Sequence, residues 1–434
     1  MKLKPVIAAV ALGLVSNIAY AKNITIDGED KGNLDLMFKV MTIVDGKDNG
    51  FDPNYGTSEL LKMKYTTPSF NGVRFSAGSY ITGDLLGTND NTLDADQKLA
   101  RGMYVTNDQS AEQLLGELHL KGQHGSFDWF AGRVIYDSPL TTAAVSTMPN
   151  FHTGAGATFK VNESFKVGLA QITQIAFGAR AATEWGLIGE GTGTAGTAIN
   201  PLDKQAEFLD IADATIANNT ENTNGITTLN ASYKLGKNAN ISLWNYYAED
   251  ISNNVYVSAD NKFPLADKRA IKVELQYLNQ TNVGADLAGD LDYSLAGAKA
   301  TYITPKWSAY VAANNSFGDT KMLNAWGGDP AYTSSIFSRN AYRENVTAFK
   351  VGAKYKITPK WILSASYADY GQSDTSTATL TPSSDATEAN VTLVWKMNKN
   401  TLFKLFHSSR TSEYDTDSND RTQAHTRLAA VVKF

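Results

Sequence analysis

The chain has no cysteine, which excludes a disulfide framework, a thiolate metal site and a cysteine nucleophile. Proline accounts for only 11 of the 434 residues. After about the first twenty residues, no apolar run is long enough for a membrane-spanning helix. The net charge of −5 and the lack of any Lys/Arg block argue against nucleic-acid binding. The 34 Gly, 20 Tyr, 18 Phe and 7 Trp instead favour many strands and turns.

Residues 1–21 have the pattern of a secretory signal peptide. Lys2 and Lys4 precede an apolar stretch, and Ala19 and Ala21 place small residues at the −3 and −1 positions of a cleavage point. The sequence therefore predicts an exported chain that is cleaved after Ala21, with residues 22–434 forming a single domain.

Apolar and polar residues alternate along the whole of that domain. Phe349, Val351 and Tyr355 fall on one face of a predicted strand. Lys350 and Lys354 fall on the other face. Such strands run for about ten residues, which is enough to cross a bilayer when tilted by roughly 45°. Soluble sandwiches also alternate, but their strands are shorter, at about five to six residues.

The connections between these strands alternate between short and long. Tight polar turns repeat an aromatic-flanked module in "YITPKWSAYV", "YKITPKWILS" and "WKMNKNTLFK", and long polar stretches such as 83–110, 173–224 and 318–345 lie between such turns. Short turns at one end and long loops at the other are typical of outer-membrane barrels.

We therefore predict an all-β fold, a transmembrane antiparallel β-barrel of about 18 strands with short periplasmic turns and long extracellular loops. The alternative is about 16 strands, because ranges 155–161, 165–172 and 254–261 are the weakest. A barrel of either size is too wide for side chains to fill. The predicted strands are 33–43, 58–68, 73–82, 112–121, 127–135, 155–161, 165–172, 225–235, 239–248, 254–261, 268–279, 290–302, 307–316, 346–357, 361–370, 388–397, 401–410 and 425–434.

The C-terminal residues form a distinct pattern. Leu428, Ala430 and Val432 fall on the same face of the last predicted strand as the terminal Phe434. A terminal Phe preceded by apolar residues at every second position resembles the signal that the outer-membrane assembly machinery reads. We expect these four residues to serve as that signal.

Two segments resemble the OprD-type substrate-specific porins and the related campylobacter-type major outer-membrane porins. The first is "FAGRVIYDSPLTTAAVSTMPNFHTG" (residues 130–154), and the second, closest to the campylobacter type, is "WGGDPAYTSSIFSRNAYRENVTAFKVGAKY" (residues 326–355). A weaker match is "WNYYAEDISNNVYVSADNKFPLADK" (residues 244–268). The family often has Arg just before the Met-Pro pair, where this chain has Ser146 and Thr147.

The resemblance implies an 18-stranded barrel, often a trimer, whose third loop folds inward near residues 136–154 as a constriction. It also implies a porin that passes ions and small hydrophilic solutes passively across the outer membrane. The alternatives are a substrate-selective channel for one small solute, or a plugged barrel that acts as an adhesin or structural envelope protein. The expected partners are membrane lipid, lipopolysaccharide, the assembly machinery and two further copies of the chain, with no nucleic acid.

Selectivity in a channel comes from the size of its narrowest part and the charges that project into it. Arg133 is the foremost candidate, because it lies on the strand that enters the inferred constriction loop, and Asp137 could face it across the pore. Arg339 and Arg343 either point toward the pore mouth or hold loops together. The remaining candidates follow from strand parity: Arg74, Lys272, Lys350 and Lys354, with Lys62, Lys64, Lys121, Lys404, Arg410 and Arg427 as further inward-facing cations.

No pattern for catalysis or a resident cofactor appears in the sequence. The five histidines are scattered, and no G-x-S-x-G, H-E-x-x-H or P-loop motif is present. We expect no enzyme activity, no catalytic residue, no metal ligand set and no cofactor. Two acidic loop clusters fit solvated charge better than a loop-bound Ca²⁺, because neither has an EF-hand pattern: Asp90, Asp94 and Asp96, then Glu413, Asp415, Asp417 and Asp420.

Overall fold

The computed structural model describes residues 22–26, 29–46, 54–87, 111–142, 147–178, 207–216, 219–323, 326–336, 338–340, 343–373, 385–413 and 420–434. The predicted signal peptide lies outside these residues, so its cleavage stays a prediction. No helix in the described part of the chain is long and apolar enough to cross a membrane.

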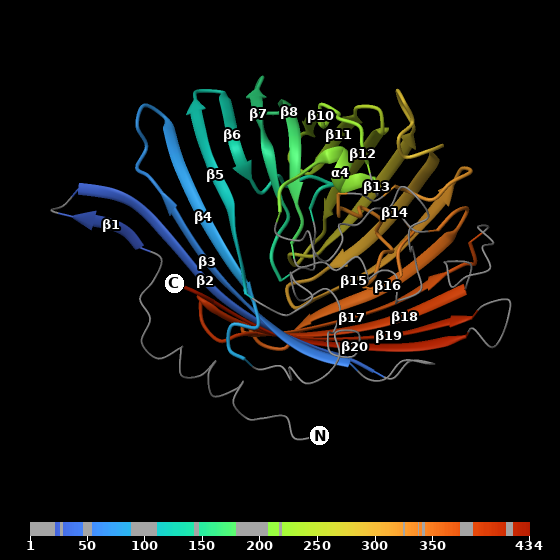
Figure 1. The fold of residues 1–434 in the computed structure, drawn as a ribbon. Coiled ribbons are helices and arrows are strands. Elements are labelled where there is room, and N and C mark those ends of the chain that lie inside the picture. Colours follow the sequence, from blue (N-terminus) through green and yellow to red (C-terminus); the bar gives the residue numbers. More distant parts are fainter. Residues whose placement is uncertain are drawn as a thin grey trace.

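The strands form one antiparallel sheet that closes into a barrel of eighteen strands (Figure 1). Strands that follow one another along the chain are neighbours, β8 pairs with β10, and β20 pairs with β2 to close the wall. Two short strands are additions to this wall, β1 (Lys22–Ile26) beside β2 and β9 (Leu209–Asp210) beside β8. The wall strands are β2 (Glu29–Asp45), β3 (Asn54–Thr66), β4 (Val73–Gly83), β5 (Glu112–His124), β6 (Phe127–Val134), β7 (Phe151–Lys160), β8 (Phe165–Ala176), β10 (Ile226–Leu235), β11 (Ala239–Ala248), β12 (Ser252–Pro264), β13 (Ala270–Thr281), β14 (Asp292–Ile303), β15 (Trp307–Phe317), β16 (Thr347–Lys356), β17 (Trp361–Tyr370), β18 (Asp385–Lys396), β19 (Thr401–Glu413) and β20 (Arg421–Lys433).

Every predicted strand range overlaps one of these wall strands, including the three weakest, so the predicted fold class is confirmed and the count of sixteen is wrong. The reason is the two-residue period of a strand, which places alternate side chains on opposite faces. In β16, Phe349 and Val351 are 57% and 50% exposed on the outer face, whereas Lys350 is buried inside the barrel. The outer face is therefore apolar and the lumen polar, as in membrane barrels.

Short turns at one end of the barrel are stabilised by their own polar side chains. Asn398 Oδ1 accepts hydrogen bonds from the backbone N–H groups of Asn400 (2.8 Å) and Thr401 (2.9 Å). Thr358 Oγ1 likewise accepts hydrogen bonds from the backbone N–H groups of Lys360 and Trp361. Asn and Thr favour such turns because their side chains can replace a missing backbone partner.

Aromatic side chains form a row on the outer face next to these turns. Trp361 and Trp395 stack with ring centroids 5.3 Å apart, and Trp395 stacks on Phe403 at 5.1 Å. A row of aromatics at this height is the interface girdle of a membrane barrel. It explains why the repeated turn module carries aromatic residues.

The C-terminal strand closes the barrel against β2. Leu428 is 45% exposed on the outer face, and the register places Ala430 and Val432 on that same face. Arg427 lies on the inward face of the same strand. Phe434 is 8% exposed, and its backbone N–H donates to Leu36 O at 2.8 Å. The terminal residue therefore lies in the closing seam, while its role as an assembly signal stays a prediction.

Deletion of Phe434 is expected to lower strongly the amount of folded protein in the outer membrane. The deletion removes both the terminal aromatic ring and the backbone donor to Leu36 in the seam. The measurement is the heat-modifiable, folded fraction in isolated outer membranes. Lys433→Gln, on the inward face of the same strand, is the matched control. Equal folded amounts in all three proteins would contradict the assembly role.

Candidate functional site

Two connections from the loop end of the barrel run inside the lumen. The first, which we call the β6 loop, comprises residues 135–142 and 147–150. Lys39 Nζ donates to Thr147 O at 3.1 Å, and the Ser58 hydroxyl lies 3.3 Å from the Thr147 hydroxyl. Lys39 and Ser58 project inward from β2 and β3. The loop thus leaves the wall at β6 and is fastened inside it at β2 and β3.

The second connection, which we call the β15 loop, comprises residues 318–323, 326–336, 338–340 and 343–346. The buried Glu388 carboxylate on β18 accepts hydrogen bonds from the backbone N–H groups of Ile336 (2.9 Å) and Ser338 (2.8 Å). Lys350 Nζ on β16 donates to Ser334 O at 2.7 Å. Charge-assisted hydrogen bonds of this kind are about twice as strong as neutral ones.

Three further inward-facing wall residues hold the same loop. Asn314 Oδ1 accepts a hydrogen bond from the backbone N–H of Thr333 at 3.0 Å, and Tyr370 OH donates to Thr333 O. Tyr293 OH donates to Asn340 O at 3.2 Å. Strands β14 to β18 therefore fix the β15 loop as a shelf that projects into the lumen.

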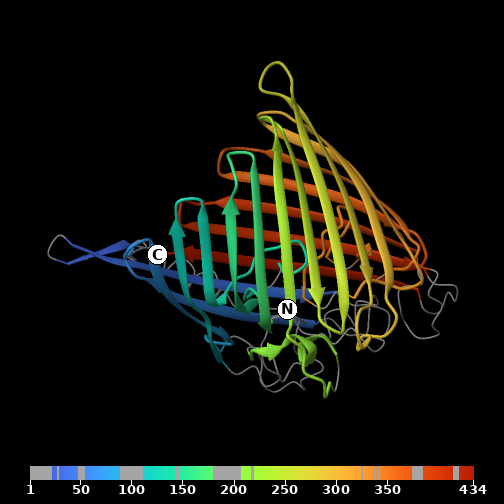
Figure 2. The same ribbon diagram turned by 90° about the horizontal axis from the view of Figure 1, so that it is seen from above.

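The two loops cross at one point inside the barrel. The backbone N–H of Gly328 donates to Leu140 O at 3.0 Å, and Asn150 Nδ2 donates to Trp326 O at 3.3 Å. Trp326 Nε1 also donates to Thr215 Oγ1 (3.3 Å) of the short helix α4 (Ile211–Thr215). Helix α4 lies at the loop end of the barrel (Figure 2). The crossing thus joins three segments that are far apart in the sequence.

Substituting Gly328→Ala is expected to separate the two loops and to change the single-channel conductance. A Cβ at this position would lie 2.3 Å from the Leu140 carbonyl carbon and 2.4 Å from Pro139 O, so the backbone would have to move. The measurement is single-channel conductance in a planar bilayer. Gly371→Ala is the control, because its nearest contact, Thr347 O at 3.5 Å, is an ordinary one. Identical conductance in all three proteins would show that the crossing does not shape the pathway.

An apolar cluster fills one side of the lumen around this crossing. Trp244 and Tyr246 stack with ring centroids 5.7 Å apart, and the Tyr136 hydroxyl lies 2.7 Å from the Thr228 hydroxyl. Burial raises the pKa of the Tyr136 phenol above its ordinary value, so this ring remains neutral. The cluster includes Leu140, Ile172, Phe177, Ile211, Tyr246, Tyr256, Leu278, Tyr293, Leu323 and Trp326. The pathway is therefore displaced toward the remaining wall.

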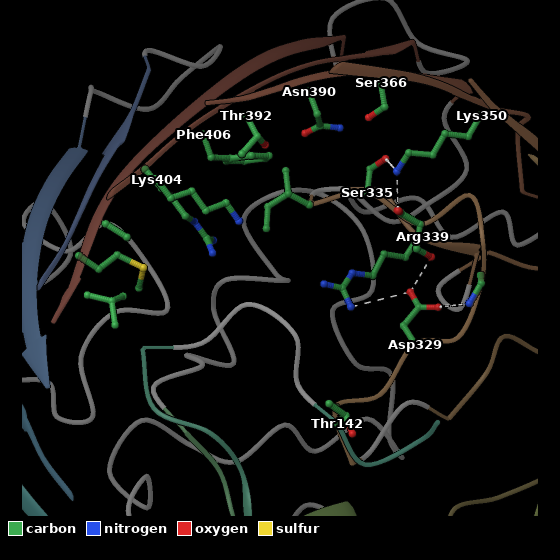
Figure 3. Close-up of a pocket in the computed structure, with 18 of the residues that line it drawn as sticks. Thr142, Asp329, Ser335, Arg339, Lys350, Ser366, Asn390, Thr392, Lys404 and Phe406 are labelled. Carbon is green, nitrogen blue, oxygen red and sulfur yellow. Dashed lines mark hydrogen bonds and ion pairs between the residues drawn. The ribbon is translucent and has the colours of Figure 1, made fainter. Parts of the chain in front are cut away.

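A cavity of about 540 Å³ lies between the β15 loop and the wall formed by β16–β20 and β2 (Figure 3). Polar side chains of the wall, among them Ser366, Asn390 and Thr392, line it. Arg339 Nη1 lies 3.8 Å from Asp329 Oδ2 on the loop side. The charged residues that line the cavity are five cations and one carboxylate, namely Lys39, Arg339, Lys350, Lys404, Arg427 and Asp329.

Comparisons with known proteins agree with this architecture. The family of outer membrane porins called OprD matches residues 197–357. This chain is an outer-membrane porin. A search of the curated proteins found no match.

Solved structures of OprD-type porins have the same fold as this porin at low sequence identity. OccK9 (OpdG) of Pseudomonas aeruginosa is 12% identical with a TM-score of 0.72, covering 92% of this chain and 98% of that one. OpdK of P. aeruginosa, solved with vanillate, is 13% identical with a TM-score of 0.70, covering 92% and 99%. OccAB4 of Acinetobacter baumannii is 12% identical with a TM-score of 0.69, covering 92% and 98%. The fold is that of these solved channels, and the family matched over residues 197–357 is one of outer membrane porins.

Four predicted inward-facing cations lie at the cavity of the porin: Lys350, Lys404 and Arg427 on its wall and Arg339 on the shelf. Arg343 has a different place. It is fully buried, its Nη1 donates to Gly371 O at 2.7 Å, and its guanidinium lies 5.6 Å from the centre of the Tyr370 ring. Of the two roles considered for Arg343, its contacts favour the one that holds loops together.

Three other predicted cations, Lys272, Lys354 and Arg74, line the lumen away from this cavity. Lys272 Nζ lies 2.8 Å from Glu274 and 3.8 Å from Asp260, so its charge is compensated by carboxylates. Lys354 is exposed on the inward face of β16, near the turn end. Arg74 lines a second cavity of about 510 Å³, together with Lys64, His119, Lys121 and Asp128.

The placement of Arg133 in the pathway was wrong. Arg133 pairs across the sheet with Leu118, which is 38% exposed on the outer face. Arg133 Nη1 donates a hydrogen bond to Leu115 O at 3.4 Å, beyond the end of the β5–β6 ladder. The guanidinium also lies 4.2 Å from the centre of the Phe208 ring. Toward the loop end of β6 the inward positions are Phe130, Gly132 and Val134 instead, and Phe130 packs against the apolar cluster that fills the lumen there.

Asp137 does not form the predicted pair with Arg133 either. Its carboxylate accepts a hydrogen bond from the Thr142 hydroxyl within the β6 loop. Among the residues described, no ion pair joins Asp137 to Arg133, since the arginine faces the outside of the wall. The two residues therefore do not face each other across the pore.

Three functional residues were missed in the sequence. Lys39 lies within a mostly apolar stretch of β2, residues 36–44, and Glu388 lies within the threonine- and valine-containing β18. A single charge at an inward position of an alternating strand was the available signal for both. Asp329 had no such signal, because it lies in an irregular loop. Of the acidic clusters considered for Ca²⁺, all but Glu413 and Asp420 lie outside the described residues.

Proposed function

We propose that this porin is a passive diffusion channel that favours small anionic solutes over cations. The observation that carries the proposal is the charge of the 540 Å³ cavity, whose lining has five cations and one carboxylate. In a narrow pathway with low-dielectric walls, such a surplus raises the local concentration of anions and lowers that of cations.

Several cations elsewhere in the lumen are paired with carboxylates, so we assign the preference to the cavity. On β12 to β14 the cations Lys272 and Lys299 alternate with carboxylates, and Glu274 lies within 4 Å of both. Lys64 likewise pairs with Glu117 at 2.5 Å. Such pairs neutralise each other and contribute little net field along the axis.

We further infer that the β6 loop and the β15 loop together form the narrowest part of the pathway. The loop fastening at Thr147 and the crossing at Gly328 support this. A substrate-selective channel is the finer alternative to a general one, and the OpdK structure with vanillate supports a carboxylate-bearing solute. We also infer that the nearest likeness is to the campylobacter-type porins, on the strength of residues 326–355, and that the protein is a trimer.

The test is the single-channel current of the refolded full chain in a planar bilayer, with the reversal potential measured under a KCl gradient. A reversal potential that indicates chloride preference is the expected result, and conductance steps in groups of three would support the trimer. Cation preference would overturn the proposal. A folded but silent barrel would favour the plugged, structural alternative, with the long 173–224 connection as the first candidate for the plug.

A further inference from the structure

One arginine lies on the lipid-facing side of the barrel. In the described wall strands, the register places every other lysine and arginine on an inward position, whereas Arg133 of β6 faces outward between Leu118 and Thr153. A cation on the lipid face of a barrel is costly at the middle of the bilayer and costs little near the interfaces. This side chain therefore needs a polar partner at an interface.

The guanidinium of Arg133 points toward the loop end of the barrel. Strand β5 runs from the loop end at Glu112 to the turn end at His124, so Leu115 lies nearer the loops than Leu118, which is directly across from Arg133. Arg133 Nη1 donates to Leu115 O. Long cationic side chains reach in this way from an apolar surface to the polar interface. The charge is therefore directed toward the membrane surface that bears the long extracellular loops.

Two contacts position the guanidinium and leave most of its donors unused. Residues 112–117 of β5 pair with β4 alone in the described ladders, so Arg133 reaches a carbonyl beyond the end of the β5–β6 pairing. The Phe208 ring adds a cation–π contact. A guanidinium has five N–H donors. In the described part of the chain, that of Arg133 makes this one hydrogen bond and no ion pair.

Exposed leucines border the guanidinium on the same outer surface. Leu115, Leu118 and Leu120 on the outward face of β5 are 39%, 38% and 43% exposed, and they run from the level of the guanidinium toward the turn end. A fixed cation above a column of leucines matches an amphiphile with an anionic headgroup and acyl chains. In an outer membrane, the amphiphile of the leaflet on the long-loop side is lipopolysaccharide, whose lipid A bears phosphates on its sugars.

We propose that Arg133 belongs to a lipid-binding site on the outer wall, where it binds a phosphate group of lipid A while an acyl chain lies along Leu118 and Leu120. The planar fork of a guanidinium can donate two parallel hydrogen bonds to phosphate oxygens. This charge contact offsets the cost of placing an arginine on a lipid-facing surface. The proposal is independent of the anion preference of the pathway, because Arg133 lies outside the lumen.

The test is native mass spectrometry of the folded full-length porin in detergent, titrated with lipid A, with dephosphorylated lipid A and with phosphatidylglycerol. We expect lipid A to bind about tenfold more tightly than its dephosphorylated form, because only the phosphate accepts charge-assisted hydrogen bonds from the guanidinium. This comparison needs no variant. Equal binding of the two forms would overturn the proposal, and equal binding of phosphatidylglycerol and lipid A would overturn the assignment to lipid A.

Arg133→Gln is expected to weaken lipid A binding by about tenfold and to leave binding of the dephosphorylated form unchanged. Arg133→Lys retains the charge without the fork and should recover part of the affinity. The matched control is Lys360→Gln, which removes one exposed cation in a short turn at the other end of the barrel. Heat-modifiable migration establishes that each variant is folded.

Two results with these variants would contradict the site. Equal lipid A affinity in the wild type and in folded Arg133→Gln would overturn it. Weaker self-association of Arg133→Gln with unchanged lipid A binding would also overturn it and would assign Arg133 to a contact between copies of the chain. Neither result changes the proposed function, which the reversal potential tests separately.

Discussion

Replacing Lys404 and Arg427 together by glutamate is expected to turn the anion preference of the channel into a cation preference. Both residues line the cavity, where the described lining has a single carboxylate, Asp329. The change reverses two charges within a narrow, low-dielectric passage, so the ratio of cation to anion permeability should rise by about tenfold or more. The measurement is the reversal potential under a KCl gradient.

The control for this experiment carries the same charge change outside the cavity. Lys306 and Lys360 are exposed in two of the short turns, and replacing both by glutamate should leave the reversal potential close to that of the wild type. If the turn variant shifts the potential as much as the cavity variant does, total charge and not the cavity sets the selectivity. If the cavity variant is folded and its reversal potential is unchanged, the cavity is not part of the ion pathway.

Glu388→Ala is expected to release the shelf and to produce a larger, noisier single-channel conductance. The fully buried Glu388 carboxylate accepts hydrogen bonds from the backbone of Ile336 and Ser338 and from the Ser408 hydroxyl (3.0 Å). Removing it leaves buried donors without this partner, at a cost of about 1–3 kcal/mol for each group. The change leaves the hydrogen-bond ladders of β18 with its neighbours intact, so we expect this part of the shelf to move rather than the barrel to unfold.

Two results together establish that effect. Thr387→Ala, on the outer face of the same strand, is the matched control and should conduct like the wild type. The folded fraction of both variants, measured by heat-modifiable migration, separates loop release from loss of the barrel. Wild-type conductance in a folded Glu388→Ala protein would mean that the shelf does not narrow the pathway.

The barrel itself could be predicted because its signal is local. Each strand alternates between lipid and lumen regardless of what its neighbours are, so β16 or β20 can be recognised without knowing their partners. The turns carry their own chemistry too, as the side-chain hydrogen bonds of Thr358 and Asn398 illustrate. Even the weakest predictions, at β7, β8 and β12, were confirmed for this reason.

The inward faces of most cations followed from the same local pattern, which is why Lys350 and Lys354 were placed correctly in the lumen. Arg133 shows where the pattern stops being informative. Aromatic and small residues occupy both faces of β6, so the alternation does not show which face of this strand points into the lumen. The inward face of β6 is set by the apolar cluster around Tyr136, against which Phe130 packs, so Arg133 faces outward.

By itself, the sequence determined the class of fold, the number and position of the wall strands, the end of the barrel with short turns and the face on which most charges lie. These features depend on residues close together in the chain. Tertiary structure alone decided which charges share one cavity, since Lys39, Arg339 and Lys404 come from segments that are distant in the sequence. It also decided that Glu388 and Gly328 hold the loops inside the lumen, because those contacts exist only once the sheet has closed.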